Sequence, residues 1–198
     1  YVIQVARLVP EKRQHDLIAA FRALKLPHWK LVLVGGSQGE DDYAASIQQA
    51  AAGDDAIVCT GTLEVAETHE LLADAGVFVL PSSHEGLPIA LLEALSCGVP
   101  ALASDIPGNR ELGLDDDSYF AVGDTAALSS RLKTLVTSAK ARAAAVRCYP
   151  EICRRFDWDN IAVSTIAVLQ KASGSPRTRV RPRRAAVATV DVEAAPQK

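Results

Sequence analysis

The 198-residue chain is 48% hydrophobic and carries a net charge of −3, as is typical of a globular domain with a sizeable core. It contains no apolar run near the roughly 20 residues that span a bilayer, and its first residues show no signal-peptide pattern. The four cysteines form no C-x-x-C pair and the four histidines lack metal-ligand spacing. We therefore expect a cytoplasmic protein with reduced, mostly buried thiols and no metal ion.

The charge is divided unevenly along the chain. Residues 1–172 carry 15 Lys and Arg against 22 Asp and Glu, a net −7, whereas residues 173–198 carry 6 against 2, a net +4. Because residues 173–198 include five Arg, three Pro and no aromatic residue, we expect them to form a disordered basic tail. A solvated tail is the simpler interpretation, and contact with anionic lipid or RNA is the alternative. The basic stretch 140–155 lacks interleaved aromatic residues, so we interpret it as a solvated face and expect no nucleic-acid partner.

Strand-like and helix-like segments alternate along the sequence. Short apolar runs predict strands, which fall at residues 1–6, 30–34, 56–60, 76–80, 99–103 and 119–122. Helical spacing and terminal signals predict helices at residues 12–24, 42–52, 67–75, 88–97 and 125–137. A further helical stretch at 140–155 is broken at Pro150, and a last helix ends at about residue 172. This alternation predicts an α/β fold with a doubly wound parallel six-stranded sheet, whose ligands bind at the carboxyl ends of the strands.

A basic loop follows the first strand. Arg7 comes directly after the strand, and Lys12 lies near the start of the next helix. An Arg supplies a planar fork and a Lys a point charge, and both suit phosphate oxygens. The alternative is two solvated surface charges.

Glycine-containing turns follow the second and third strands. The turn Gly35–Gly39 is not a G-x-G-x-x-G motif, so a dinucleotide fingerprint is not supported. Gly61-Thr62-Leu63 connects the third strand to a helix, and Leu63 on its own reads as an apolar residue that closes the helix start. Taken alone, each turn is a weak functional signal.

Two carboxylates stand out around the fourth strand and the helix that follows it. Glu85 lies in the loop before Pro88, which we expect at the first helical position, and Glu93 is the lone charged residue of an apolar helix that ends at Gly98. The unpaired N–H groups of the helix N-terminus favour an anion, and about 8 Å of helical rise separates the two carboxylates along it. An elongated ligand with an anionic centre fits this arrangement, and a crossover helix with one solvated Glu is the alternative.

The run EGLPIALLEALSCGVPALASDIPGNREL, with seven residues between Glu85 and Glu93, resembles the E-x7-E segment of retaining GT-B glycosyltransferases of family four. The run VARLVPEKRQHDLIAAF resembles the opening of the nucleotide domain in that family, although the family often has Gly where Arg13 stands. The likeness covers roughly residues 2–170. It implies the C-terminal, donor-binding half of an enzyme that transfers a sugar from a nucleotide diphosphate sugar to a hydroxyl acceptor, with retention of configuration.

The resemblance also implies roles for particular residues. In catalysis, Arg7 and Lys12 would neutralise the donor diphosphate, and Glu85 would approach the donor sugar. Glu93 would hold the ribose of the nucleotide. The remaining substrate contacts would come from backbone near the sugar, the diphosphate and the base, at Gly86, Leu87, Ile89, Leu63 and Gly36.

The chain contains no Met and begins in a strand-like segment, so we expect a donor-binding domain at residues 1–172 whose N-terminal acceptor domain is missing. A glycan or lipid-linked acceptor would bind through that missing domain, in glycan or surface polysaccharide synthesis, and the isolated piece would catalyse little. No cofactor is expected beyond the donor itself. The alternatives are a non-catalytic nucleotide-sugar-binding module and a GT-B-like nucleotide-sugar epimerase.

Overall fold

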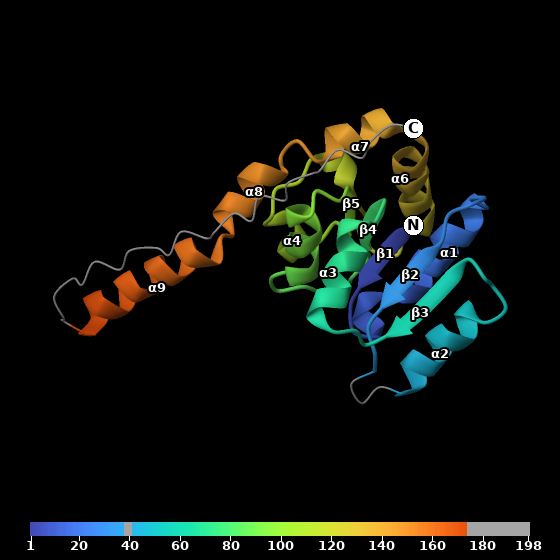
Figure 1. Cartoon of the computed structure of the whole chain (residues 1–198), viewed down its shortest axis with the longest axis horizontal. Coiled ribbons are helices and arrows are strands. Elements are labelled where there is room, and N and C mark those ends of the chain that lie inside the picture. The colour runs from blue at the N-terminus through green and yellow to red at the C-terminus, as the bar shows by residue number, and fades with distance from the viewer. Residues whose placement is uncertain (38–40, 174–198) are drawn as a thin grey trace, which may run out of the picture. The chain divides into compact units, whose positions relative to one another are not determined.

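A computed structural model describes residues 1–37 and 41–173. Within these residues, six parallel strands form one sheet in the order β3-β2-β1-β4-β5-β6 (Figure 1). The strands are β1 (Val2–Val5), β2 (Leu31–Val34), β3 (Ile57–Gly61), β4 (Val77–Leu80), β5 (Ala101–Ser104) and β6 (Tyr119–Phe120). The predicted doubly wound parallel sheet is confirmed.

Helices connect the strands and cover both faces of the sheet. The connecting elements are η1 (Pro10–Lys12), α1 (Gln14–Leu24), α2 (Asp41–Ala51), α3 (Val65–Ala73), α4 (Ile89–Ser96), α5 (Pro107–Arg110), η2 (Asp116–Ser118), α6 (Thr125–Thr137), α7 (Ala139–Ala145) and α8 (Tyr149–Arg155). Helices α1, α2 and α6 pack together on one face, and α3 and α4 pack together on the other (Figure 1). This two-sided cover buries β2, β4 and β5 along their whole length, which is why their sequences are continuous apolar runs rather than alternating ones.

Two compact units divide the chain, residues 1–155 and residues 156–198. The second contains α9 (Trp158–Ser173), a single helix that leaves Trp158, Val168 and Leu169 exposed. No helix in the described residues is long and apolar enough to cross a membrane. The predicted basic tail from residue 174 onward, and residues 38 and 39 of the predicted glycine turn, lie outside the described residues.

The helix predicted at residues 12–24 is interrupted at Arg13. Residues 10–12 form the 3-10 turn η1, Arg13 adopts φ 51° and ψ 41°, and α1 begins at Gln14. This left-handed conformation favours Gly, which explains why Gly is common here in the family that the sequence resembles. The Arg13 side chain bonds Asp16 at 2.6 Å, a contact that a glycine would lack.

Three further local predictions were wrong. Pro88 precedes α4 as its N-cap instead of starting the helix. The break in the stretch 140–155 falls between α7 and α8, and Pro150 lies in the first turn of α8, where its missing N–H costs nothing. The thiols are not buried, because Cys97 is exposed and the other three are half-buried.

Candidate functional site

The carboxyl ends of β1, β2 and β3 surround a pocket of about 220 Å³. Its lining includes three predicted site residues from separate segments, Arg7, Gly36 and Leu63, together with Thr62 and Thr68. Arg7, Gly36 and Leu63 follow β1, β2 and β3, respectively, and parallel packing brings the carboxyl ends of these strands to one edge of the sheet. The structure therefore places the predicted diphosphate cation Arg7 beside the two predicted nucleotide contacts.

Glycine is required in the turn that forms this pocket. Gly35 has φ +138°, and a Cβ atom there would lie 2.0 Å from the Ala6 carbonyl oxygen. A Cβ atom on Gly36 would lie 2.5 Å from Thr62 Oγ1. The glycines thus allow the ends of the three strands to approach one another, which gives the weak sequence signal a steric explanation.

Lys12 and Glu85 are joined in a largely buried ion pair. Lys12 Nζ lies 2.7 Å from Glu85 Oε1, and the two side chains are 15% and 10% exposed. The Ser83 N–H also donates to the Glu11 carbonyl oxygen at 2.8 Å, so the loops that follow β1 and β4 are bonded through backbone as well. These strands are neighbours where the strand order reverses, which is where open α/β sheets bind ligands.

Arg7 is held far less tightly than Lys12. Its side chain is 51% exposed, and Arg7 Nη2 lies 3.4 Å from Glu11 Oε1. A guanidinium in this position is free to reorient toward an anion that enters the pocket, because an exposed pair of this length contributes little.

The loop between Glu85 and α4 has an exposed outer surface and a rigid support. A Cβ atom on Gly86 would meet no described atom within 4 Å, and Leu87 and Ile89 are exposed. The Ile89 N–H already donates to the Leu87 carbonyl oxygen at 2.9 Å, so this predicted backbone donor is occupied. Gly108 supports the loop from behind, because a Cβ atom there would lie 2.3 Å from the Glu85 carbonyl oxygen.

Gly108 lies in α5, the short helix that follows β5, and side-chain bonds fix this connection. Asn109 Nδ2 donates to the Ser104 carbonyl oxygen at 2.9 Å, and Ser104 Oγ donates to the Ser82 carbonyl oxygen. At the surface, hydrogen bonds from the Arg110 guanidinium lower the pKa of Asp105. These bonds hold the connection that supports the loop of Glu85 in place.

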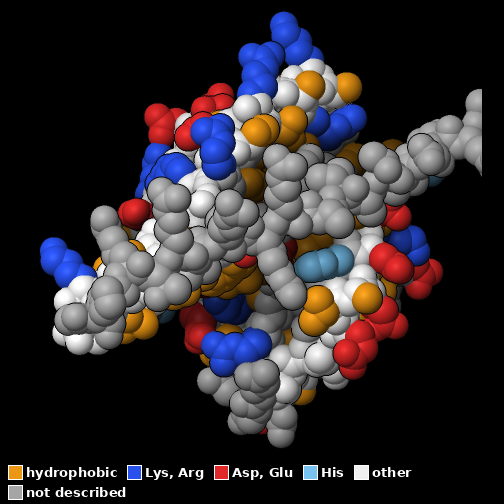
Figure 2. Space-filling model, turned by 60° about the vertical axis from the view of Figure 1, so that its left-hand side comes forward, with side chains coloured by type: hydrophobic (Ala, Val, Ile, Leu, Met, Phe, Trp, Pro, Cys, Tyr) orange, Lys and Arg blue, Asp and Glu red, His pale blue; other side chains and the backbone are white. Residues whose placement is uncertain are grey.

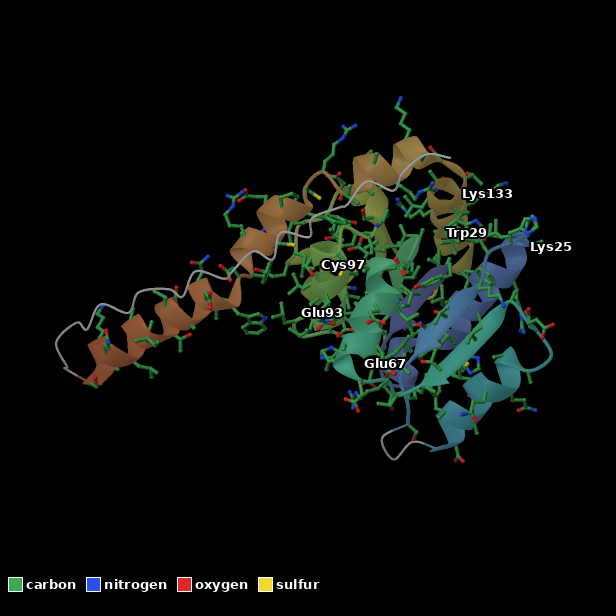
Figure 3. All side chains as sticks on the ribbon, viewed as in Figure 1. Lys25, Trp29, Glu67, Glu93, Cys97 and Lys133 are labelled. Carbon is green, nitrogen blue, oxygen red and sulfur yellow. The ribbon has the colours of Figure 1, made fainter. Side chains whose placement is uncertain are left out.

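Glu93 projects from α4, beside the helix α3 that carries Glu67 (Figure 3). Its side chain is 37% exposed, and Glu93 Oε1 lies 3.7 Å from His69 Nε2 on α3. The carboxylate is therefore accessible and also has a neighbour, as the lone charge of an apolar helix must. The His69 side chain is half exposed beside it.

Charged side chains are not evenly mixed on the face shown in Figure 2. Asp and Glu side chains gather along the right of the view, whereas Lys and Arg predominate at the top. No group of three or more His, Cys, Asp and Glu side chains is placed to hold a metal ion in the described part of the chain.

Sequence reasoning missed two buried glutamines beside these cations. Gln4 Nε2 donates to the Lys12 carbonyl oxygen at 2.9 Å, and Gln14 Nε2 donates to the Arg7 carbonyl oxygen at 2.8 Å. Both side chains are 1% exposed. A polar residue inside the apolar run Val2–Val5 was the signal that could have drawn attention to Gln4.

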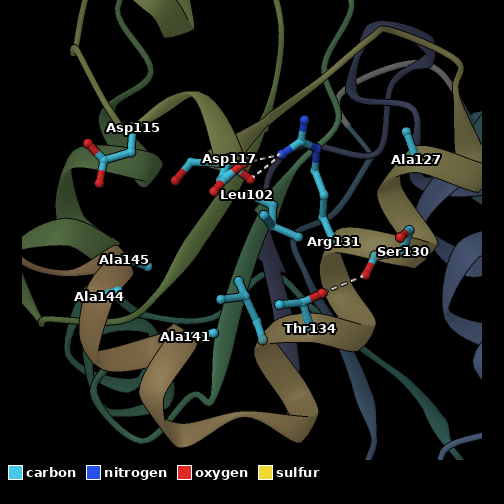
Figure 4. A pocket seen from close by; sticks show the side chains of 12 residues that line it. Leu102, Asp115, Asp117, Ala127, Ser130, Arg131, Thr134, Ala141, Ala144 and Ala145 are labelled. Carbon is cyan, nitrogen blue, oxygen red and sulfur yellow. Dashed lines mark hydrogen bonds and ion pairs between the residues drawn. The ribbon is translucent and has the colours of Figure 1, made fainter.

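A larger pocket, of about 560 Å³, lies beside α6, α7 and η2 (Figure 4). Its lining includes Leu102 and Leu135, and α7 contributes only alanines, at positions 141, 144 and 145. Among the lining residues, the Arg131 guanidinium donates to the Asp117 carbonyl oxygen at 2.6 Å. The pocket exists because methyl groups are too short to fill the space between α7 and the sheet.

Ala145→Leu should fill part of this pocket and raise the free energy of unfolding by about 0.5–1.5 kcal/mol, through added apolar burial. Urea unfolding measures the change. Ala143→Leu on the exposed side of the same helix is the control and should alter stability by less than about 0.5 kcal/mol. Equal effects of the two substitutions would show that helix propensity, and not filling of the pocket, is responsible.

The fold matches the C-terminal half of GT-B structures. Anabaena HepE in complex with UDP-glucose superposes with a TM-score of 0.78 over 86% of this chain and 48% of that protein, at 23% identity. Sucrose-phosphate synthase from Thermosynechococcus elongatus superposes with a TM-score of 0.76 over 87% of this chain and 45% of that protein, at 22% identity. At these identities the likeness establishes the architecture.

Sequence comparison establishes the family. The model of the family described as Glycosyl transferases group 1 matches residues 1–147. Alpha-maltose-1-phosphate synthase of Mycolicibacterium smegmatis is 31% identical over 85% of this chain and 47% of that protein. O-antigen chain mannosyltransferase B of Escherichia coli is 27% identical over 84% of this chain and 44% of that protein. The chain belongs to the glycosyl transferases group 1 family, and it spans about half the length of these curated relatives.

Proposed function

We propose that residues 1–172 are the donor-binding domain of a retaining glycosyltransferase that transfers a sugar from a nucleotide diphosphate sugar to a hydroxyl group. The observation that carries this proposal is the Lys12–Glu85 pair at the strand-order reversal. A cation suited to phosphate and a carboxylate suited to sugar hydroxyls lie there within 2.7 Å of each other. A donor with its sugar attached to a diphosphate needs this adjacency.

In the proposed complex, the diphosphate binds between Arg7 and Lys12, and the nucleoside extends into the pocket that contains Gly36 and Leu63. The ribose hydroxyls donate to Glu93, which is accessible on α4. The sugar lies over the exposed loop formed by Gly86, Leu87 and Ile89, where Glu85 accepts hydrogen bonds from its hydroxyls. Membership of the family and the shared pocket of Arg7, Gly36 and Leu63 support this placement.

The proposed chemistry is mainly electrostatic. Negative charge grows on the diphosphate as the bond to the anomeric carbon breaks, and fixed cations stabilise that charge more in the transition state than in the ground state. Arg7 and Lys12 are the cations, and Glu85 stabilises positive charge at the anomeric carbon. The acceptor hydroxyl binds mainly through a preceding domain, so this domain alone should bind nucleotide and catalyse little.

We further propose a glycan acceptor, by analogy with the similar O-antigen chain mannosyltransferase B. A cytoplasmic location, with the basic residues 173–198 as a peripheral membrane contact, is consistent with the charge distribution.

A thermal-shift titration with UDP, GDP and ADP tests the donor site. One nucleoside diphosphate should raise the Tm by several degrees, because a ligand that binds only the folded state stabilises it, by roughly 2.7 kcal/mol at one hundred times its Kd. Glu93→Ala and Arg7→Ala should each reduce the shift, whereas Lys133→Ala on the exposed side of α6 should preserve it. No shift with any of the three nucleotides in the folded domain would contradict the proposal.

A further inference from the structure

Each of the two proposed diphosphate cations has its main-chain carbonyl held by a buried glutamine. Gln4 lies in the middle of the central strand β1 and donates to Lys12, and Gln14 lies in the first turn of α1 and donates to Arg7. A carbonyl oxygen accepts hydrogen bonds only, so in both contacts the amide must present its NH2 group. The two bonds cross, since the earlier glutamine holds the later cation and the later glutamine holds the earlier cation.

Core packing does not explain these two side chains. Both are 1% exposed, and the Oε1 atom of each has no hydrogen-bond partner among the described residues. Burying an acceptor without a partner destabilises a protein, and an apolar side chain of similar length would avoid that cost. The favourable contribution of each glutamine is therefore the single bond that its NH2 group makes to the cation loop.

The loop that these bonds hold contains strain and has few other ties to the sheet. Arg13, immediately after Lys12, has a left-handed backbone conformation without being glycine. The loop is also joined to its surroundings by the Lys12–Glu85 ion pair and by two backbone bonds, from the Leu8 N–H to the Gly36 carbonyl oxygen at 3.0 Å and from the Ser83 N–H to the Glu11 carbonyl oxygen at 2.8 Å, where the Ser83 hydroxyl also donates at 3.4 Å. Within the loop, the Arg7 carbonyl oxygen also accepts from the Val9 N–H at 3.1 Å. The two glutamine bonds therefore join the main chain of Arg7 and of Lys12 to side chains outside the loop.

We propose that Gln4 and Gln14 are positioning residues that fix the separation between the main chain of Arg7 and that of Lys12, so that both side chains reach one diphosphate at the same time. This inference rests on the proposed function. A diphosphate needs two cations at a set distance, whereas a monophosphate needs only one. Loss of either glutamine bond should therefore weaken binding of a nucleoside diphosphate more than binding of the corresponding monophosphate.

The test is the ratio of the Kd for UMP to the Kd for UDP, measured by calorimetry for the wild type, Gln4→Met and Gln14→Met. If GDP or ADP is the preferred nucleotide, it is used with its monophosphate. Met matches the length of Gln and removes both amide atoms, and each site is tested separately so that one folded variant is sufficient. We expect the ratio to fall about tenfold, as is common when a group that orients a ligand-binding residue is lost, while the Kd for UMP changes less than about twofold.

Tyr149→Phe is the matched control. Tyr149 is also buried, and its hydroxyl accepts a hydrogen bond from the N–H of Ala101. Ala101 is the first residue of β5 and so lies at the amino end of its strand, away from the cation loop. This substitution should lower stability and leave the ratio of the two Kd values unchanged. A wild-type ratio retained in folded Gln4→Met and Gln14→Met would overturn the positioning role alone. Failure of the wild type to bind any nucleoside diphosphate would overturn the proposed function, and the inference with it.

Discussion

Lys12→Met should lower the free energy of unfolding of this domain by about 2–3 kcal/mol, because it leaves the Glu85 carboxylate largely buried without its partner. The pair is short and shielded, with an N···O distance of 2.7 Å and side chains only 15% and 10% exposed. Urea unfolding at neutral pH measures the effect. The double variant Lys12→Met with Glu85→Gln should regain a large part of the loss, since no uncompensated charge is then left behind.

Arg7→Met provides the comparison within the same loop. Its pair with Glu11 is 3.4 Å long and about half exposed, so the loss of stability should be below about 0.5–1 kcal/mol. Both single variants should nevertheless weaken binding of a nucleoside diphosphate. If the Lys12 and Glu85 substitutions have additive effects on stability, the ion pair contributes nothing and this prediction is wrong.

Gly108→Ala should destabilise the domain by about 1–3 kcal/mol through overpacking and should weaken donor binding at least about tenfold, because a misplaced substrate-positioning group is costly. The added Cβ atom would lie 2.3 Å from the Glu85 carbonyl oxygen and 2.9 Å from the Gly86 carbonyl oxygen. Backbone atoms cannot rotate away as a flexible side chain can, so the loop that presents Glu85 must move. Unfolding measurements and calorimetry with a nucleotide sugar give the two effects.

Gly53→Ala is the control for this substitution. Gly53 has φ +75°, and a Cβ atom there would meet no described atom within 4 Å, so the variant introduces backbone strain of about 1 kcal/mol without a clash. Donor binding should stay at the wild-type value. Normal donor binding by Gly108→Ala would show that the support behind Glu85 is not needed.

The sequence predicted the sheet well because each strand is a separate apolar run, and parallel strands must alternate with helices. It could not predict the direct contact between Lys12 and Glu85. Each residue was predicted as a site residue from the sequence around it. The contact between the two depends on β1 and β4 becoming neighbours where the strand order reverses. Their separation of 73 residues is invisible to any local pattern.

Local departures from the predictions have local physical causes. Arg13 interrupts the predicted helix because its backbone is left-handed there. The residue type gives no sign of this, since a left-handed residue is usually Gly. The Ile89 N–H is occupied by the Leu87 carbonyl oxygen, a turn that the residue types alone do not specify. Gln4 and Gln14 were overlooked because a glutamine can serve equally well on a surface, and only the fold shows that both are buried.

The central place of β1 also has a consequence for how the protein folds. β1 pairs with β2 on one side, and on the other side Val2 and Ile3 pair with Val77 and Phe78 of β4. At ribosomal rates of about 5–20 residues per second, the second partner is synthesised roughly 2–9 s after the first. During that interval one apolar edge of β1 is open to wrong pairings between chains. Slow, non-local closure of the sheet thus leaves the strand that leads to Arg7 and Lys12 exposed to aggregation during synthesis.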